Sequence, residues 1–208
     1  MPPVDFKKTQ RELYQPKITP GIIDVPSMTF LAVDGIGDPN TSAEYAAAIE
    51  TLYALSYSIK MNNKHILEYV VPPLEGFWAT TDDFKGGAAS IPNKDNFVWT
   101  TLIRQPDFVT EEIFDAARAL LAKKKPHIDT GKARLIQLTE GLCAQIMHIG
   151  PYDDEPASIV AMEHYVRENG YETEITPTRR HHEIYLSDPR KVAPEKQKTI
   201  IRHPIKKA

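Results

Sequence analysis

The sequence predicts an α+β protein made of two strand-helix-strand modules that share one mostly antiparallel sheet, with helices on one face. The chain of 208 residues has 41% apolar and 25% charged residues, which is the balance of an ordinary globular protein. A faint duplication divides it. Near residue 35 and again near residue 150, an apolar run ends in a glycine turn and leads through acidic and proline residues into a helix.

The first module is expected over residues 28–125. Residues 1–27 carry five prolines and little periodicity, so we expect an extended leader. Thr41 and Glu44 form a capping box, and the apolar spacing that follows predicts a helix through residue 60. The expected strands are Met28–Val33, Leu67–Val71 and Phe97–Arg104, with a loop containing Gly86, Gly87 and Pro92 before the last of them.

The second module is expected over residues 126–208. The helix that closes the first module starts at Thr110, with acidic residues in its first turn and lysines in its last, as the helix dipole favours. A further helix is expected from Pro156 to Gly170, because proline suits a first turn and glycine ends a helix. The expected strands are Arg134–Leu138, Leu142–Ile149 and His181–Leu186.

Charge and composition exclude several classes of partner. The formal net charge of −3 argues against direct nucleic-acid binding, and the leader cannot supply a helix-turn-helix. No apolar run is long enough to span a membrane and no signal peptide is visible, so we expect a cytoplasmic protein. The single cysteine, Cys143, allows no internal disulfide and is typical of a small buried hydrophobe.

Glu183 is the first candidate for chemistry. Side chains alternate along the strand 181–186, so Glu183 shares a face with His181 and Tyr185, while His182 points the other way. A carboxylate among apolar groups is costly unless it is paired, and its pKa tends to rise. Such a group can bind a cationic or polarised ligand or move protons. The alternative from this segment alone is a glutamate on an exposed sheet face.

Aromatic residues offer material for a flat, stacking pocket around this glutamate. Tyr152 follows a Gly-Pro turn and joins Glu183 as a candidate catalytic residue. Core packing explains any single ring equally well. The residues expected to bind a ligand are Trp78, Trp99, Phe97, Glu75 and Tyr185.

No cofactor or metal is expected. Gly35-x-Gly37 lacks the third glycine and the parallel context of a dinucleotide site. His181 and His182 point to opposite faces of a regular strand, so they cannot grip one metal together, and one cysteine cannot build a zinc cluster.

Four separated motifs resemble the GyrI-like small-molecule-binding family, most closely its stand-alone branch. They are Val70–Trp78, Trp99–Thr110, Gly141–Pro156 and His182–Arg190. The resemblance implies two strand-helix-strand-strand modules in a pseudo-twofold arrangement, with a ligand cleft between them and Glu183 at its base. Drug-sensing relatives can use a tyrosine beyond this strand. The run 194–199 offers no ring, so Trp78 and Trp99 are expected to take that role.

The resemblance also suggests a function. Part of the stand-alone branch is associated with hydrolysis of cyclopropane-bearing, DNA-alkylating compounds. We therefore predict a protein that binds small planar or aromatic apolar molecules and hydrolyses reactive members of that class, for cellular protection. The alternatives are a non-catalytic ligand sensor or sequestering protein, and a regulator that binds a protein partner, such as an inhibitor of a DNA-processing enzyme. A homodimer is also compatible with the sequence.

Overall fold

The computed structural model describes residues 2–80 and 94–208, so the loop predicted around Gly86, Gly87 and Pro92 lies outside the described residues. The strands are β1 Gly21–Ile36, β2 Leu74–Thr80, β3 Phe97–Gln105, β4 Arg134–Ile149, β5 Tyr171–Thr173, β6 His181–Tyr185 and β7 Lys198–Lys207. The α-helices are α1 Phe6–Thr9, α2 Arg11–Tyr14, α3 Ala43–Asn62, α4 Glu111–Lys124 and α5 Glu155–Glu168. Short 3₁₀ turns are η1 Lys94–Asn96, η2 Tyr152–Asp154 and η3 Pro194–Lys196.

Six strands close into a barrel. Their order is β4-β1-β3-β2-β6-β7, each pairing is antiparallel, and β4 pairs with β7 to complete the ring. The α+β class and the antiparallel sheet are confirmed. The closure was not predicted, because it joins strands that are far apart in the chain. The twofold relation between the halves stays a prediction.

The barrel has a distinct inside and outside. One buried cluster takes side chains from five of the six barrel strands, among them Phe30 of β1, Leu102 of β3 and Ile200 of β7, and the partly buried Phe77 of β2 packs against it, so this cluster fills the interior. The neighbours Leu31, Ile103 and Ile201 belong to two other clusters on the outer surface. The alternation of side chains along each strand thus sorts residues between core and outer layer.

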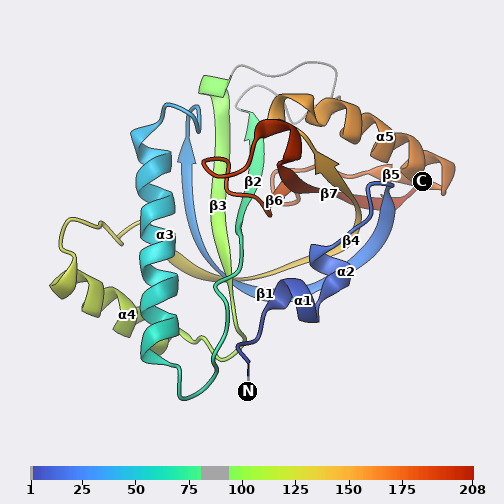
Figure 1. The fold of residues 1–208 in the computed structure, drawn as a ribbon. Coiled ribbons are helices and arrows are strands. Elements are labelled where there is room, and N and C mark those ends of the chain that lie inside the picture. The colour runs from blue at the N-terminus through green and yellow to red at the C-terminus, as the bar shows by residue number, and fades with distance from the viewer. Residues whose placement is uncertain (1, 81–93) are drawn as a thin grey trace.

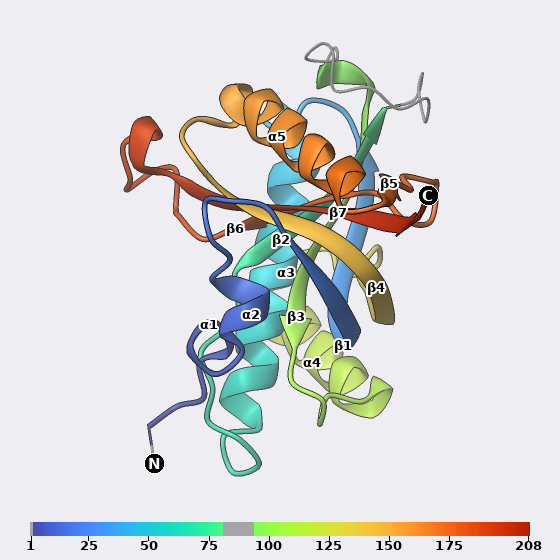
Figure 2. The ribbon, with the colours of Figure 1, turned by 90° about the vertical axis from the view of Figure 1, so that its right-hand side faces the viewer.

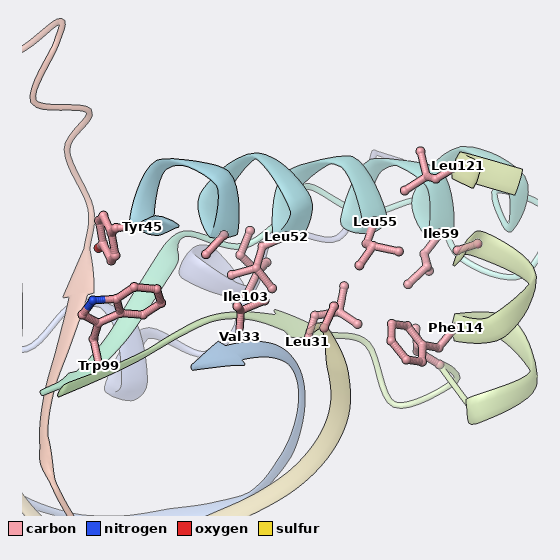
Figure 3. Close-up of a cluster of buried hydrophobic side chains, with 14 residues drawn as sticks. Leu31, Val33, Tyr45, Leu52, Leu55, Ile59, Trp99, Ile103, Phe114 and Leu121 are labelled. Atoms are coloured by element: carbon pink, nitrogen blue, oxygen red, sulfur yellow. The ribbon is translucent and has the colours of Figure 1, made fainter. Parts of the chain in front are cut away.

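Helices cover the outer surface on two sides. α3 runs along β1 and β3 with α4 beside it, and α5 lies over β4 and β7 on another side of the barrel (Figure 1). Figure 3 shows Leu52, Leu55 and Ile59 of α3 directed toward Leu31 and Ile103 of the sheet. Each helix therefore buries one apolar stripe against the barrel wall. No helix among the described residues is long and apolar enough to cross a membrane.

The N-terminal segment differs from an extended leader. It forms α1 and α2, which lie close to the barrel in both ribbon views, and α2 places Leu13 and Tyr14 in the interior cluster (Figures 1 and 2). Residues 21–27 already belong to β1. These two short helices therefore contact the inner core, whereas α3, α4 and α5 lie on the outer face.

Three strand predictions need correction. The strand expected over Leu67–Val71 is wrong, since Tyr69 makes only an isolated bridge to Val4 and pairing with the sheet begins after two prolines, at Leu74. The two strands expected over 134–149 are one, because pairing with β1 continues through Gly141, whose φ is +65°. β7 was missed, since it is buried on both faces and so lacks alternation.

Charged side chains also lie inside the barrel. His182 contacts Glu140 through Nδ1 (2.9 Å) and Glu75 through Nε2 (3.0 Å), and Arg202 donates to Glu140 (2.8 Å). Burial alone would lower the pKa of His182, but the charge and hydrogen bond of Glu140, followed by those of Glu75, outweigh it and raise this pKa to about 9. Burial likewise opposes the His182 and Arg202 charges at Glu140, whose pKa falls to about 2.

The same network holds the N-terminal helices. Arg202 donates to the carbonyl oxygen of Leu13 (3.0 Å), and Gln145 donates to that of Glu12 (2.7 Å). Because the hydrogen bond of Arg202 to Leu13 is buried, removing its donor leaves an unsatisfied group. The ion network therefore connects four barrel strands to the leader.

A first prediction concerns Gly35, which pairs with Trp99 across β1 and β3. A Cβ atom at Gly35 would lie 2.2 Å from Cη2 of Trp99, whose ring is fully buried. Gly35→Ala should therefore lower the free energy of unfolding by about 1–3 kcal/mol, measured by urea titration. Gly21→Ala is the control, since a Cβ atom there would have no neighbour within 4 Å. Equal stability of the two variants would contradict this packing.

A second prediction follows from His182. Its pKa is higher in the folded protein than its ordinary 6.5, so its stabilising contribution is complete below pH 6.5 and is lost as the pH rises through about 9. The free energy of unfolding should fall over this window. His182→Gln should flatten the fall and cost about 3–5 kcal/mol at pH 6.5, since Glu75 and Glu140 both lose an ion-pair partner, while Arg202 still pairs with Glu140. His127→Gln, at an exposed position, should keep the wild-type pH dependence.

Candidate functional site

An open cleft of about 1700 Å³ lies on the outside of the barrel. Its walls come from both halves of the chain: α3 and β2 on one side, η2 and α5 on the other, with β6 and β7 at its floor. The residues that matter for the chemistry below are Tyr45, Trp78, Phe97, Tyr152, Glu155, His181, Glu183, Tyr185 and His203.

Two carboxyl groups meet at the floor of the cleft. The Glu183 side chain is 14% exposed, and Glu155, the first residue of α5, is 6% exposed. Burial raises the pKa of Glu155 well above its usual range, and the charge of Glu183 and a hydrogen bond to it raise it further. Burial and the nearby Glu183 thus both favour the protonated form of Glu155.

Further donors converge on Glu183. Nε2 of His181 lies 2.9 Å from Oε1 of Glu183, and Tyr185 also hydrogen-bonds this carboxylate. On the other side of its ring, His181 contacts Nε2 of His203 through Nδ1 at 2.7 Å. Three side chains thus hydrogen-bond Glu183: the imidazole of His181, the phenol of Tyr185 and the carboxyl group of Glu155.

Aromatic rings form the walls above these acids. Nε1 of Trp78 donates to the Tyr185 hydroxyl (2.8 Å), and Tyr152 packs edge-on against Tyr185 with ring centres 5.8 Å apart. Tyr45 and Phe97 flank Trp78 at 5.8 and 5.5 Å. Such an arrangement presents flat apolar surface with a few polar groups.

Gly76 makes this close packing feasible. It pairs with Glu183 across β2 and β6, and a Cβ atom there would lie 2.7 Å from Nε1 of Trp78 and 3.0 Å from the Tyr185 hydroxyl. The absence of a side chain lets the indole and the phenol meet directly above the strand.

The phenols of the cleft stay protonated. Burial, followed by the charge of Glu183, raises the pKa of Tyr152 to about 12, and the same two causes raise the pKa of Tyr185 and Tyr45 well above the usual value. At neutral pH, these groups can donate hydrogen bonds but carry no charge.

A family model described as the GyrI-like small molecule binding domain matches residues 19–206. The chain belongs to this family. A comparison with curated proteins gave no match.

Solved structures extend the comparison of this GyrI-like chain. It is similar to an uncharacterized conserved protein from Listeria innocua, with 44% identity over 98% of this chain and 100% of that chain and a TM-score of 0.91. A hydrolase from Listeria innocua has 42% identity over the same shares and a TM-score of 0.88. The EcmrR C-terminal domain, at 12% identity over 91% of this chain and 98% of that chain and a TM-score of 0.54, shares the fold alone.

Five of the residues predicted for the GyrI-like site line the cleft: Glu183, Tyr152, Trp78, Phe97 and Tyr185. Two do not. Glu75 is 1% exposed and lies inside the barrel, where it hydrogen-bonds His182. It is three positions from Trp78 on β2, so the two side chains point to opposite faces of the strand. Trp99 has the predicted phase but is fully buried beneath Tyr45, with ring centres 5.0 Å apart. Its role is to support the wall.

Four cleft residues were missed by sequence reasoning. Glu155 stands in an acidic run before Pro156, which is typical of any helix start, so nothing singled it out. Tyr45 fits the apolar stripe of a helix. His181 shares its strand face with Glu183, a usable signal. His203 belongs to β7, a strand that was not predicted.

A metal could in principle bind in this cluster. One nitrogen or oxygen atom from each of Glu155, His181 and Glu183 lies within 4.8 Å of the others, a spacing compatible with a cation. At 2.9 Å, however, the His181 nitrogen and the Glu183 oxygen need a proton between them, and a protonated nitrogen has no lone pair for a metal. Hydrogen bonds account for the cluster without an ion.

A third prediction tests the protonated state of Glu155. A carboxyl group whose pKa is raised on folding reduces stability as the pH rises above its ordinary 4.5. Glu155→Gln keeps the shape and removes this penalty, so its free energy of unfolding at pH 7 should exceed that of the wild type. Glu168→Gln, at an exposed position of the same helix, should change it little. A less stable Glu155→Gln protein would show that the carboxylate form is the native one.

Proposed function

We propose that this chain binds planar, largely apolar small molecules in its cleft and adds water to electrophilic members of that class, in particular cyclopropane-bearing compounds. The observation that carries this proposal is the pair of carboxyl groups at the floor of an aromatic cleft, Glu183 and Glu155, of which burial and the neighbouring Glu183 raise the pKa of Glu155. Family membership supports the binding, and the similar Listeria innocua protein called a hydrolase supports turnover.

Binding rests on the ring-lined walls. A flat ligand would stack against Trp78 and Phe97 on one side and meet Tyr152 on the other, and burial of apolar area would supply most of the affinity. With few polar groups between the rings, the cleft favours ligands by shape more than by a fixed hydrogen-bond pattern.

The chemistry uses the two acids in different roles. The cyclopropane of such a compound is strained and conjugated to a carbonyl group. Glu183 takes one proton from water as the water oxygen forms a bond to the electrophilic ring carbon. The breaking carbon–carbon bond releases its electron pair through the conjugated system to the carbonyl oxygen.

The developing negative charge on that oxygen needs a donor. Tyr152 or Tyr185 can supply a hydrogen bond, since both phenols stay protonated. The carbonyl oxygen finally takes one proton from Glu155, the acid of the pair. The net change is addition of one water molecule. The hydrogen bond between Glu155 and Glu183 lets the proton gained by Glu183 pass to Glu155, so both acids return to their starting state.

The proposal is tested by incubating the pure protein with a cyclopropanoid compound and following the mixture by mass spectrometry. A water adduct that forms in proportion to enzyme concentration supports hydrolysis. Saturable binding of unchanged compound would instead identify a sequestering or sensing protein. Neither adduct nor binding would end the proposal.

A fourth prediction assigns the base. Glu183→Gln keeps the size and hydrogen-bonding capacity of the side chain but cannot accept the proton, so kcat should fall by about 100- to 10,000-fold while ligand binding changes little. Glu195→Gln, at an exposed position, is the control and should keep full activity. Loss of binding together with turnover would indicate a charge-recognition pocket instead of a base.

A further inference from the structure

A chain of two histidines leads to Glu183 from the far side of the cleft floor. His203 of β7 contacts His181 of β6, which contacts Glu183, at 2.7 and 2.9 Å. The two rings meet at an interplanar angle of 68°. His203 is 3% exposed, and no carboxylate is paired with it among the described residues. The two histidines therefore differ from the common arrangement in which a carboxylate orients a histidine.

We propose that His203 and His181 are positioning residues that form a neutral relay, in which each ring carries its proton on Nε2 and the last N–H is directed at Glu183. This inference rests on the function proposed above. It explains which of the two acids is the base.

The tautomers follow from one unpaired atom. Nδ1 of His203 is buried and has no hydrogen-bond partner within residues 2–80 and 94–208. A buried N–H without an acceptor is rarely tolerated in proteins, so this nitrogen carries the lone pair. The ring proton then sits on Nε2 of His203 and is donated to Nδ1 of His181. His181 in turn has its own proton on Nε2, facing Glu183.

The competing arrangement is less favourable on two counts. If His181 donated to His203, it would need a proton on both nitrogens, because its Nε2 also faces the Glu183 oxygen. His203 would then hold a buried N–H that no described residue accepts, and His181 would carry a positive charge. Burial, followed by the proximity of His181, lowers the pKa of His203 well below its usual value, which agrees with a neutral ring.

The remaining groups around Glu183 are acids and phenols. Tyr45 faces it from α3, Tyr152 from η2, Tyr185 from its own strand, and Glu155 from α5 with Asp153 nearby. A fixed N–H from His181 therefore distinguishes Glu183 from Glu155, and it favours the carboxylate form at Glu183. The shared proton of the two acids then stays with Glu155, leaving Glu183 free to act as the base.

The tautomers can be measured without any substrate. Nitrogen-15 NMR of histidine-labelled wild-type protein at pH 7, with signals assigned through His181→Gln and His203→Gln, should show both rings neutral and protonated on Nε2. A doubly protonated His181, or a His203 ring protonated on Nδ1, would overturn the relay. This readout stays valid even if the protein turns over no compound, so the two proposals can fail separately.

The positioning role has its own kinetic test, the fifth prediction. His203→Leu removes the donor to His181 and should lower kcat by about 10- to 100-fold with KM changed little, and should displace the acidic limb of the pH–rate profile. His203→Gln supplies an amide N–H and should recover most of the loss. The exposed variant His164→Leu should behave as the wild type.

Thermal unfolding of each variant separates positioning from general damage. Folded His203→Leu with unchanged kcat and pH profile would overturn the role, as would a His203→Gln protein no better than His203→Leu. If His203→Leu does not fold, His181→Leu gives the same comparison, since it removes the N–H donated to Glu183. His181→Gln, whose amide can accept from His203 and donate to Glu183, should then recover most of the loss.

Discussion

The hydrogen bonds of His182 inside the barrel set the phase of β6, and the cleft depends on that phase. Both ring nitrogens contact carboxylates, Glu140 from β4 and Glu75 from β2, and the charge is buried on all sides. Neighbouring residues of a strand point to opposite faces. With His182 directed inward, His181 and Glu183 must face outward. A slip of one residue would take the His182 cation away from Glu75 and Glu140 and remove the acid from the cleft.

Close packing of glycine against indole forms the second constraint. Gly35 lets Trp99 lie flat against β1, and Gly76 lets Trp78 approach Tyr185. Trp99 in turn supports Tyr45, which lines the cleft. The wall that a ligand would touch is thus the outer surface of a hydrophobic core, so it is already formed before any ligand arrives. A pre-formed wall lowers the entropy lost on binding.

The two acids at the floor of the cleft lower the stability of the folded protein. Two carboxyl groups share a buried space, which keeps a proton on Glu155 at a pH where an exposed glutamate would have lost it. Strongly perturbed acids in a cleft are common at functional sites, because the same burial that costs folding energy provides a base and an acid at neutral pH. The interior network and the outer clusters supply the stability that this arrangement uses.

The sequence by itself determined the class of fold, the helices α3, α4 and α5, and the shared face of Glu183 and Tyr185, because periodicity and capping are local properties. Only the tertiary structure decided which residues meet. Closure of the barrel brings β7 beside β6 and β4, and with it His203 and the charged interior. Glu75 and Trp78 differ by three positions and end on opposite faces of the wall, while Glu155 and Glu183 differ by 28 and end in contact. The first relation follows from alternation along one strand. The second arises from the path of the chain around a closed sheet, which the sequence separation does not reveal.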